Sequence, residues 1–377
     1  MTGRANDEGV NSDRYLALDV LRGMTIVLMI LVNTPGSWKY VYAPLEHAEW
    51  HGCTLTDLVF PFFLFVAGVS TFFSFAKYSN KRRGESFWRV GHRTLLIFAL
   101  GLFINSYPQW ITDYSHLRIP GVLQRIALSY GLAAFIILST RRKWLPGIAA
   151  IILLSYWAML YFFGGPDPYS LSGNAVGVLD RTVFGENHLY HGFGIPFDPE
   201  GILSSLSAAV TVIIGYWMGM IIHESLKNRI VLKLAGFGAA FTAAGYLWGL
   251  VFPLNKPLWT SSYVLYTAGL ATLLFALLIY IIDIKGYKKW TPFFSIFGVN
   301  PLFLFILSVL WGKTLRLLIH IPDGTGGAIN GSAWLYQNIF VPIAGNMNGS
   351  LLFAVAHIAL FWIIGYILYR SRIFVKI

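Results

Sequence analysis

Long apolar segments alternate with shorter polar ones along the whole chain. A helix needs about 20 mostly apolar residues to cross roughly 30 Å of hydrocarbon. This pattern predicts an all-α, polytopic membrane protein with about ten transmembrane helices. They are expected near residues 17–34, 54–76, 90–106, 121–139, 145–163, 200–223, 230–252, 259–282, 293–319 and 350–370.

One further apolar segment, residues 334–344, is too short to count as a span. It contains Pro342 and is followed by Gly345. Irregular backbone at membrane depth is tolerated only where protein or water covers it. An external or re-entrant segment is therefore expected. The alternative is a full crossing, which would move the C-terminus to the other side of the membrane.

The composition agrees with a membrane protein. Hydrophobic residues make up 56% of the chain and charged residues only 12%, whereas about 25% are charged in soluble domains. The net charge of +11 could suggest a nucleic-acid partner, but the basic residues gather in short loops. One set of loops and termini holds 18 of them and the opposite set holds 4. The positive-inside rule then places both termini in the cytoplasm, and the predicted partner is a lipid bilayer with no nucleic acid.

The rest of the chain organisation follows from this topology. Residues 1–13 are polar and acidic, unlike the basic start of a signal peptide, and are expected to form a disordered cytoplasmic tail. Residues 14–377 are expected to form one transmembrane domain, with outer loops near 35–53, 164–199 and 320–349. The single cysteine, Cys53, excludes an internal disulfide and a cysteine-based metal cluster.

Candidate chemistry lies at the predicted outer face. His47 sits just outside the membrane, where an imidazole can act as a base or a nucleophile. Asp57 lies about one turn inside the second helix and could hold and polarise that histidine. Two alternatives stay open: His47 as an ordinary interfacial residue among aromatics, and Asp57 as the ion-pair partner of Arg118 or Arg125.

Other polar groups are expected at the same membrane depth. Asn33 ends the first helix, Gln124 and Arg125 lie in the outer half of the fourth, and Asp198 and Glu200 mark the start of the sixth. Polar and ionisable groups in membrane helices are costly and are functional candidates by default. Together these residues predict a polar ring facing the outer side.

A second cluster is expected at the cytoplasmic side. Asp19 and Arg22 are three residues apart on one helix face, and Arg93 and Asn300 also lie in inner halves of helices. They could line a pocket for an anionic cofactor, or Asp19 and Arg22 could form only a local ion pair. His188 and His191 are close in sequence, but without a defined third ligand they do not predict a metal site.

Read as motifs, these segments resemble heparan-α-glucosaminide N-acetyltransferase and its bacterial relatives. The similar segments follow in order and cover nearly the whole chain. They are LDVLRG at 18–23, VN at 32–33, HAEWHG at 47–52, DLVFP at 57–61, RIPGVLQR at 118–125, HLY at 188–190, DPEGIL at 198–203 and LW at 258–259 continuing to Tyr263.

The resemblance implies an enzyme that moves an acetyl group from cytoplasmic acetyl-CoA, its co-substrate, to a glucosamine-like amino sugar on the far side of the membrane. It implies catalytic roles for His47, Asn33 and Asp57, and no metal. Cofactor contacts are then expected from Arg22, Asp19, Arg93 and Asn300. Substrate contacts are expected from Gln124, Arg125, Asp198, Glu200, His188 and Trp50.

The chain lacks the large non-cytoplasmic region that precedes the core in the animal enzyme, so a bacterial plasma membrane is the expected location. His47 is expected either to act as general base or to be acetylated and pass the group on. Asn33 is a candidate donor to the developing oxyanion. Two other functions stay open: a sugar O-acyltransferase, and a transporter or flippase without acyl chemistry. A homodimer is left open as well.

Overall fold

The computed structural model describes residues 15–77, 83–108, 114–322 and 327–375. The predicted disordered tail, 1–13, lies outside the described residues. The helices are α1 Leu16–Asn33, α2 Leu55–Lys77, α3 Arg83–Ser106, α4 Val122–Ser139, α5 Leu145–Phe163, α6 Ala175–Phe184, α7 Ser204–Glu224, α8 Lys227–Trp248, α9 Ser261–Leu278, α10 Thr291–Val299, α11 Pro301–Leu317, α12 Gly331–Leu335 and α13 Val341–Arg370. Strands β1 His320–Pro322 and β2 Ala328–Asn330 pair antiparallel, and α9 continues as a π-helix over Ile279–Ile284.

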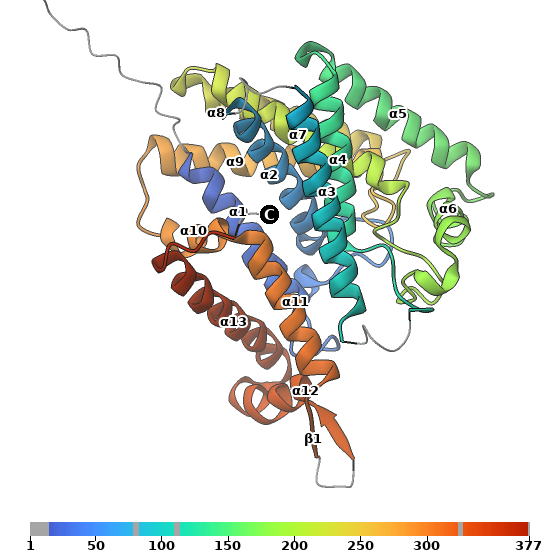
Figure 1. Cartoon of the computed structure of the whole chain (residues 1–377), viewed down its shortest axis with the longest axis vertical. Coiled ribbons are helices and arrows are strands. Elements are labelled where there is room, and N and C mark those ends of the chain that lie inside the picture. The colour runs from blue at the N-terminus through green and yellow to red at the C-terminus, as the bar shows by residue number, and fades with distance from the viewer. Residues whose placement is uncertain (1–14, 78–82, 109–113, 323–326, 376–377) are drawn as a thin grey trace, which may run out of the picture.

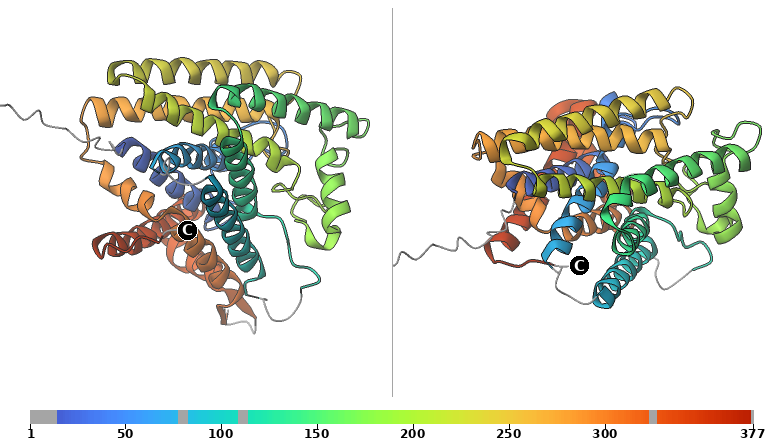
Figure 2. Two further views of the ribbon diagram at one scale, coloured as in Figure 1. Left: turned by 45° about the horizontal axis from the view of Figure 1, so that its top comes forward. Right: turned by 90° about the horizontal axis from the view of Figure 1, so that it is seen from above.

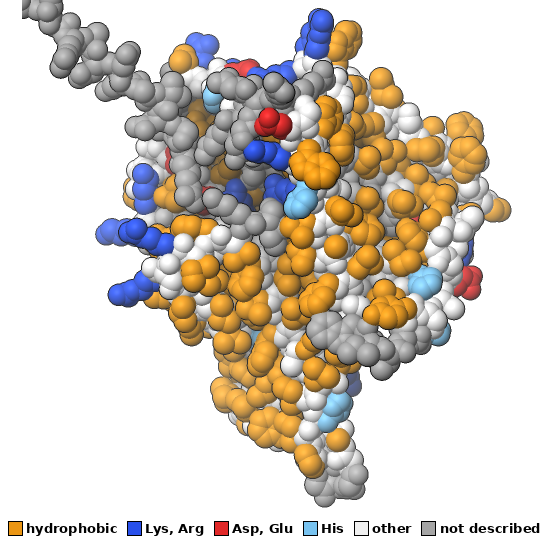
Figure 3. All heavy atoms as spheres, in the orientation of Figure 1, with side chains coloured by type: hydrophobic (Ala, Val, Ile, Leu, Met, Phe, Trp, Pro, Cys, Tyr) orange, Lys and Arg blue, Asp and Glu red, His pale blue; other side chains and the backbone are white. Residues whose placement is uncertain are grey.

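The fold is all-α and fits a polytopic membrane protein. Within the described residues, nine helices are long and apolar enough to cross a membrane, or ten if the bent pair α10 and α11 is one span. In Figure 3, apolar side chains cover most of the visible surface, and lysines and arginines gather toward its left and upper edge. Such a surface suits hydrocarbon on the sides and water at the ends.

The core is built around α2 and α7, which pack along each other (Figure 1). α7 is buried on most of its circumference. Glycines let the two backbones approach closely, as small residues do in membrane bundles. A Cβ added at Gly68 would lie 2.1 Å from the carbonyl oxygen of Val212, and one added at Gly215 would lie 2.1 Å from that of Phe65.

The remaining helices surround this pair. Figures 1 and 2 show α8 and α9 side by side along one edge, while α11 and α13 extend toward the opposite edge with the β1–β2 hairpin beyond them. We call the end of the bundle that holds residues 35–54 the loop end. The opposite end, where α1 begins and α13 finishes, is the terminal end.

Most predicted spans agree with the structure. The predicted spans 17–34, 54–76, 121–139 and 145–163 match α1, α2, α4 and α5 closely, and those at 200–223, 230–252 and 259–282 match α7, α8 and α9 less closely. The predicted span 90–106 lies within α3, but this helix begins earlier, at Arg83. The first two turns of α3 are polar, so a search for apolar segments misses them, although they belong to the same helix.

The span predicted at 293–319 is present as two helices with a sharp bend between them, not as one continuous helix. α10 and α11 meet at an angle of 82° at Asn300. Asn300 has φ −125° and ψ 53°, and it precedes Pro301. The residue before a proline is driven out of the helical region, so the helix breaks here and restarts at the proline.

The predicted outer loop at 320–349 is largely ordered secondary structure, because it holds the hairpin, α12 and the start of α13. The helix is interrupted at Gly345, whose φ is 73°. The Phe340 ring lies 5.4 Å from the ring of Phe353, so the chain before Gly345 folds back on the span that follows it. Segment 334–344 therefore packs against the helix that follows it. The predicted loop at 164–199 likewise contains a helix, α6.

Candidate active site

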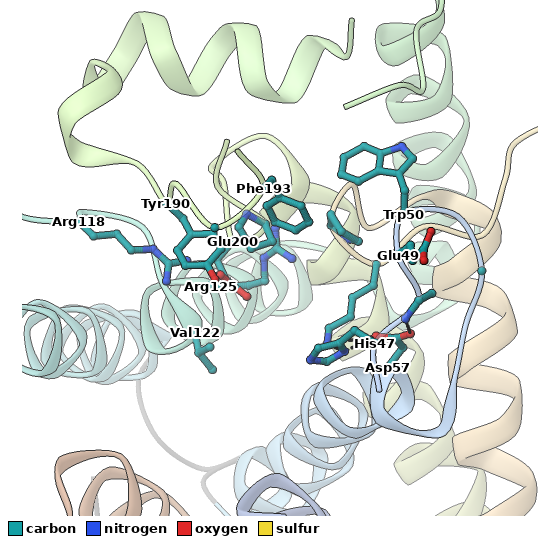
Figure 4. Close-up of a pocket in the computed structure, with 16 residues that line it drawn as sticks. His47, Glu49, Trp50, Asp57, Arg118, Val122, Arg125, Tyr190, Phe193 and Glu200 are labelled. Atoms are coloured by element: carbon teal, nitrogen blue, oxygen red, sulfur yellow. Dashed lines mark hydrogen bonds and ion pairs between the residues drawn. The ribbon is translucent and has the colours of Figure 1, made fainter. Parts of the chain in front are cut away.

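A cavity of about 540 Å³ opens at the loop end (Figure 4). It brings together the loop before α2, the start of α4, the segment before α7 and the segment before α9. Its lining residues are His47, Ala48, Glu49, Trp50, Gly52, Asp57, Arg118, Val122, Arg125, Tyr190, Gly192, Phe193, Pro199, Glu200, Lys256 and Pro257.

Asp57 is the anchor of this site. It lies in the first turn of α2 and is 2% exposed. Its Oδ2 accepts hydrogen bonds from the backbone N–H groups of Ala48 and Thr54, each at 3.1 Å, and from the Thr54 hydroxyl at 3.0 Å. These donors fix the carboxylate and fold the preceding loop over it.

The other carboxylate oxygen faces His47. The distance from Asp57 Oδ1 to His47 Nδ1 is 2.7 Å. Because a carboxylate can only accept, Nδ1 carries the proton in this contact, and in the neutral imidazole Nε2 then keeps its lone pair. The His47 side chain is 46% exposed, in contrast to its buried partner. The pair thus presents one basic nitrogen, held in a defined orientation, to the cavity.

Lys256 completes this group, and the sequence did not single it out. Its Nζ lies 3.4 Å from Asp57 Oδ1 and 3.2 Å from His47 Nδ1. Burial lowers the pKa of this amine, while the Asp57 carboxylate opposes that shift. The available signal was that Lys256 is one of few basic residues on the predicted outer side. The Tyr263 hydroxyl, also from the α9 region, donates to the Asp57 carbonyl at 2.5 Å.

The opposite wall is held by Arg118. It donates to both carboxylate oxygens of Asp198, at 2.8 and 2.7 Å, and to Glu200 at 2.5 Å. These carboxylates raise the pKa of Arg118 although burial opposes them. The guanidinium also lies 4.9 Å from the centre of the Tyr190 ring. Asp57 therefore pairs with His47 and Lys256, and Arg118 is engaged elsewhere.

Arg125 lines the same cavity from α4 but is 1% exposed. It donates to the Ser204 hydroxyl and lies 4.9 Å from the centre of the Trp259 ring. Its neighbour Gln124 is buried against Gly101 and Gly121 and is not among the lining residues.

Aromatic side chains form part of the cavity wall. The Trp50 ring packs edge to face against Phe193, with ring centres 5.9 Å apart, and its indole N–H donates to the Tyr169 carbonyl at 2.8 Å. His188 does not line the cavity. It bonds the Leu117 carbonyl at 2.7 Å and so holds the segment that carries Arg118.

Asn33 is not brought to His47. It lines a separate cavity of about 230 Å³ with Arg316, His357 and the turn that follows α1. The hydroxyl of Thr34 bonds back to Ile30 and closes α1 at this point. The chain then runs through a long loop before it reaches His47.

Another cavity, of about 260 Å³, lies at the terminal end and is lined by Arg22 and Arg93. Arg22 bonds Asp19 at 3.1 Å, Ser70 at 2.7 Å and the Gly298 carbonyl at 3.2 Å. Arg93 lies 4.8 Å from the centre of the Tyr130 ring. Two of the predicted cofactor-binding residues thus share one basic cavity, with Asp19 holding the first of them.

Asn300 does not line this cavity. Its side chain donates to the Ile373 carbonyl and accepts from the Val375 N–H, both at 2.9 Å. It ties the C-terminal segment to the break between α10 and α11. Val375 in turn lines the cavity.

The loop-end and terminal-end cavities are lined by residues of the same two helices, α2 and α4. On α4, Arg125 lines the first and Ile126 the second. On α2, Asp57 lines the first and Phe63 the second, six residues or about 9 Å further along the axis.

Comparison with known proteins gives consistent results. A family model described as heparan-alpha-glucosaminide N-acetyltransferase, catalytic, matches residues 14–176, which include His47, Asp57 and Arg125. Human heparan-alpha-glucosaminide N-acetyltransferase is 28% identical over 424 aligned residues, covering 97% of this chain and 60% of the human protein. The mouse protein is 27% identical, covering 97% of this chain and 61% of its own length. The chain thus spans about 60% of the length of these curated relatives, and over that length it is similar to heparan-alpha-glucosaminide N-acetyltransferases.

Proposed function

We propose that this protein transfers an acetyl group from acetyl-CoA to the amine of a glucosamine-like sugar, with His47 at the reacting centre. The observation that carries the proposal is the His47–Asp57 pair at the wall of the loop-end cavity. A histidine held by a buried carboxylate, with its second nitrogen free, is the arrangement that general bases and nucleophile-activating groups share. The similarity to heparan-alpha-glucosaminide N-acetyltransferases supports the reaction class.

In the proposed reaction, His47 Nε2 takes a proton from the acceptor amine as the amine nitrogen attacks the thioester carbon. Asp57 keeps the proton on Nδ1 and stabilises the imidazolium that forms. The carbon–sulfur bond then breaks, and His47 gives its proton to the leaving sulfur. Direct acetylation of His47, followed by transfer to the amine, uses the same geometry and stays the alternative.

The acceptor side of the proposal rests on the cavity wall. Trp50, Tyr190 and Phe193 offer ring faces and edges to an apolar sugar face, while Glu49 and Glu200 offer acceptors for hydroxyl or amine hydrogens. Gln124 and His188 act, in this proposal, by supporting the wall, since neither lines the cavity.

The donor side rests on the terminal-end cavity. Arg22 and Arg93 are suited to the phosphates of CoA, because guanidinium groups bind phosphate oxygens with two hydrogen bonds. Because α2 and α4 line both cavities, the thioester end is proposed to pass along these two helices toward His47. With both termini in the cytoplasm, this arrangement transfers the acetyl group outward. The proposed setting is a bacterial plasma membrane.

The test is CoA release by purified protein supplied with acetyl-CoA and either glucosamine or glucose. The wild type should release CoA with glucosamine, and His47→Ala should not, while retaining acetyl-CoA binding. His320→Ala, which changes an exposed histidine on β1, is the matched control and should behave as wild type. Undiminished glucosamine-dependent release by His47→Ala would remove His47 from the mechanism. Release with glucose alone would instead favour a sugar O-acyltransferase.

A further inference from the structure

The guanidinium of Arg125 combines burial with access to the loop-end cavity. The residue is 1% exposed, yet it is one of the cavity-lining residues. One of its Nη groups donates to Ser204, and its Nε has no hydrogen-bond partner among the described residues. A buried donor without a partner is costly, so a ligand that accepts from this side chain would relieve that cost.

Among the described residues, the charge of Arg125 is also not compensated by a direct ion pair. Arg118, on the same cavity, has ion pairs with Asp198 and Glu200. In the described part of the chain no carboxylate lies within ion-pair distance of Arg125. A buried cation of this kind needs a compensating negative charge. The cavity is where such a charge can be supplied.

The position of Arg125 indicates which group of the substrates would supply the compensating negative charge. Arg125 and Ile126 are consecutive on α4 and line the loop-end and terminal-end cavities respectively. Under the proposed function, the thioester reaches His47 across this boundary. Asn33, the residue expected from sequence to stabilise the oxyanion, lines a different cavity.

We propose that Arg125 is a catalytic residue that donates to the thioester carbonyl oxygen and stabilises the negative charge formed there during acetyl transfer. This inference rests on the proposed function. As the amine nitrogen bonds to the carbonyl carbon, the carbonyl π-electron pair moves onto the oxygen facing Arg125. That pair re-forms the C=O bond when the carbon–sulfur bond breaks, and the sulfur leaves with the proton that His47 removed from the amine.

The surroundings of Arg125 suit this role. The Trp259 ring and the Ser204 hydroxyl hold the guanidinium in place before any substrate arrives. Donors fixed in advance, in a site with little water, stabilise a developing oxyanion without reorganisation at the moment of reaction.

The experiment combines kinetics with infrared spectroscopy of acetyl-CoA labelled with ¹³C at the acetyl carbonyl. In the wild type, the bound carbonyl band should lie at lower frequency than in water. Arg125→Gln should lose that shift and lose about 10²–10³-fold in kcat with glucosamine, with acetyl-CoA affinity changed only a few-fold. Arg125→Lys keeps the charge and should lose less. Arg142→Gln is the matched control, since it removes an exposed arginine that lines neither cavity and should leave the band where it is in the wild type.

Two results would overturn the assignment. One is a carbonyl band of acetyl-CoA bound to the wild type that has the same frequency as in water. This result does not depend on whether any variant folds. The other is an Arg125→Gln defect seen only with acceptors that carry a carboxylate or sulfate, which would make Arg125 an anion site for the acceptor. Absence of CoA release by the wild type would contradict the proposed function itself. It differs from the two results above because it is a failure of the wild-type reaction and not of the role of Arg125.

Discussion

At the scale of single residues, the central feature is one buried carboxylate shared by two nitrogen bases. Asp57 bonds His47 at 2.7 Å and lies 3.4 Å from the Lys256 amine. The contact with His47 joins residues ten positions apart, and a histidine followed by an aspartate one turn into a helix is a pattern that sequence reasoning can find. Lys256 is about 200 positions away along the chain, so only the packing of α9 against α2 brings it to the site.

The pairing leads to a prediction for Asp57→Asn. An amide can donate to Nδ1, which would place the imidazole proton on Nε2 and remove the lone pair that faces the cavity. By analogy with the triad aspartate, kcat should fall by about 10⁴-fold, while acetyl-CoA binding is retained. The measurement is the initial rate of glucosamine acetylation. A loss of less than tenfold would show that Asp57 does not set the state of His47.

Asp180 gives a prediction for stability against pH. Its carboxyl group, on α6, is buried, and burial raises the pKa of Asp180 to about 7 although the Ile202 N–H opposes this. Between pH 4 and 7 the folded chain therefore binds a proton that the unfolded chain releases, so the contribution of Asp180 to stability falls as pH rises through this window.

Asp180→Asn should remove that dependence, and at pH 8 it should be no less stable than the wild type. The check is the thermal unfolding temperature measured from pH 5 to 8. Asp167→Asn, which changes an exposed carboxylate of the same loop, is the control and should keep the wild-type slope. Parallel wild-type and Asp180→Asn curves would contradict the assignment.

At the scale of elements, apolar length predicted where the spans lie but not how they bend or touch. Hydropathy shows how apolar a segment is but not whether it bends. The sequence therefore predicted one helix where α10 and α11 meet at 82°. Asn300 followed by Pro301 was the local signal for that break. The contact of α2 with α7 depends on glycines that face each other, which no single-sequence pattern reveals.

That contact predicts the effect of Gly215→Val. The Cβ of the new valine would lie 2.1 Å from the Phe65 carbonyl oxygen. This distance is too short for non-bonded atoms, so α2 and α7 would have to move apart. Because α2 carries Asp57, we expect both a lower unfolding temperature and a lower kcat. Gly236→Ala, on α8, has open space around its new methyl group and should be neutral. Equal stability of the two variants would show that the close approach of α2 and α7 does not matter.

At the scale of the whole molecule, the site residues divide between two ends of one bundle. His47, Asp57, Arg125 and Glu200 were predicted from sequence and line one cavity, while Asp198, also predicted, is buried behind its wall and holds Arg118. Arg22 and Arg93 line another. Asn300 was assigned by its depth in the membrane, and Asn33 by its depth and by the family resemblance. Neither criterion says which way a side chain faces. Each of them lies outside the cavity expected for it.

The division between the two ends carries the central claim, transfer of an acetyl group across the membrane. The measurement that tests it most directly uses protein oriented in liposomes, with labelled acetyl-CoA on the side of the termini and glucosamine on the side of His47. The account predicts label on the sugar with wild type and none with His47→Ala. Transfer that occurs only when both substrates are on the same side, or that is unchanged in His47→Ala, would contradict it.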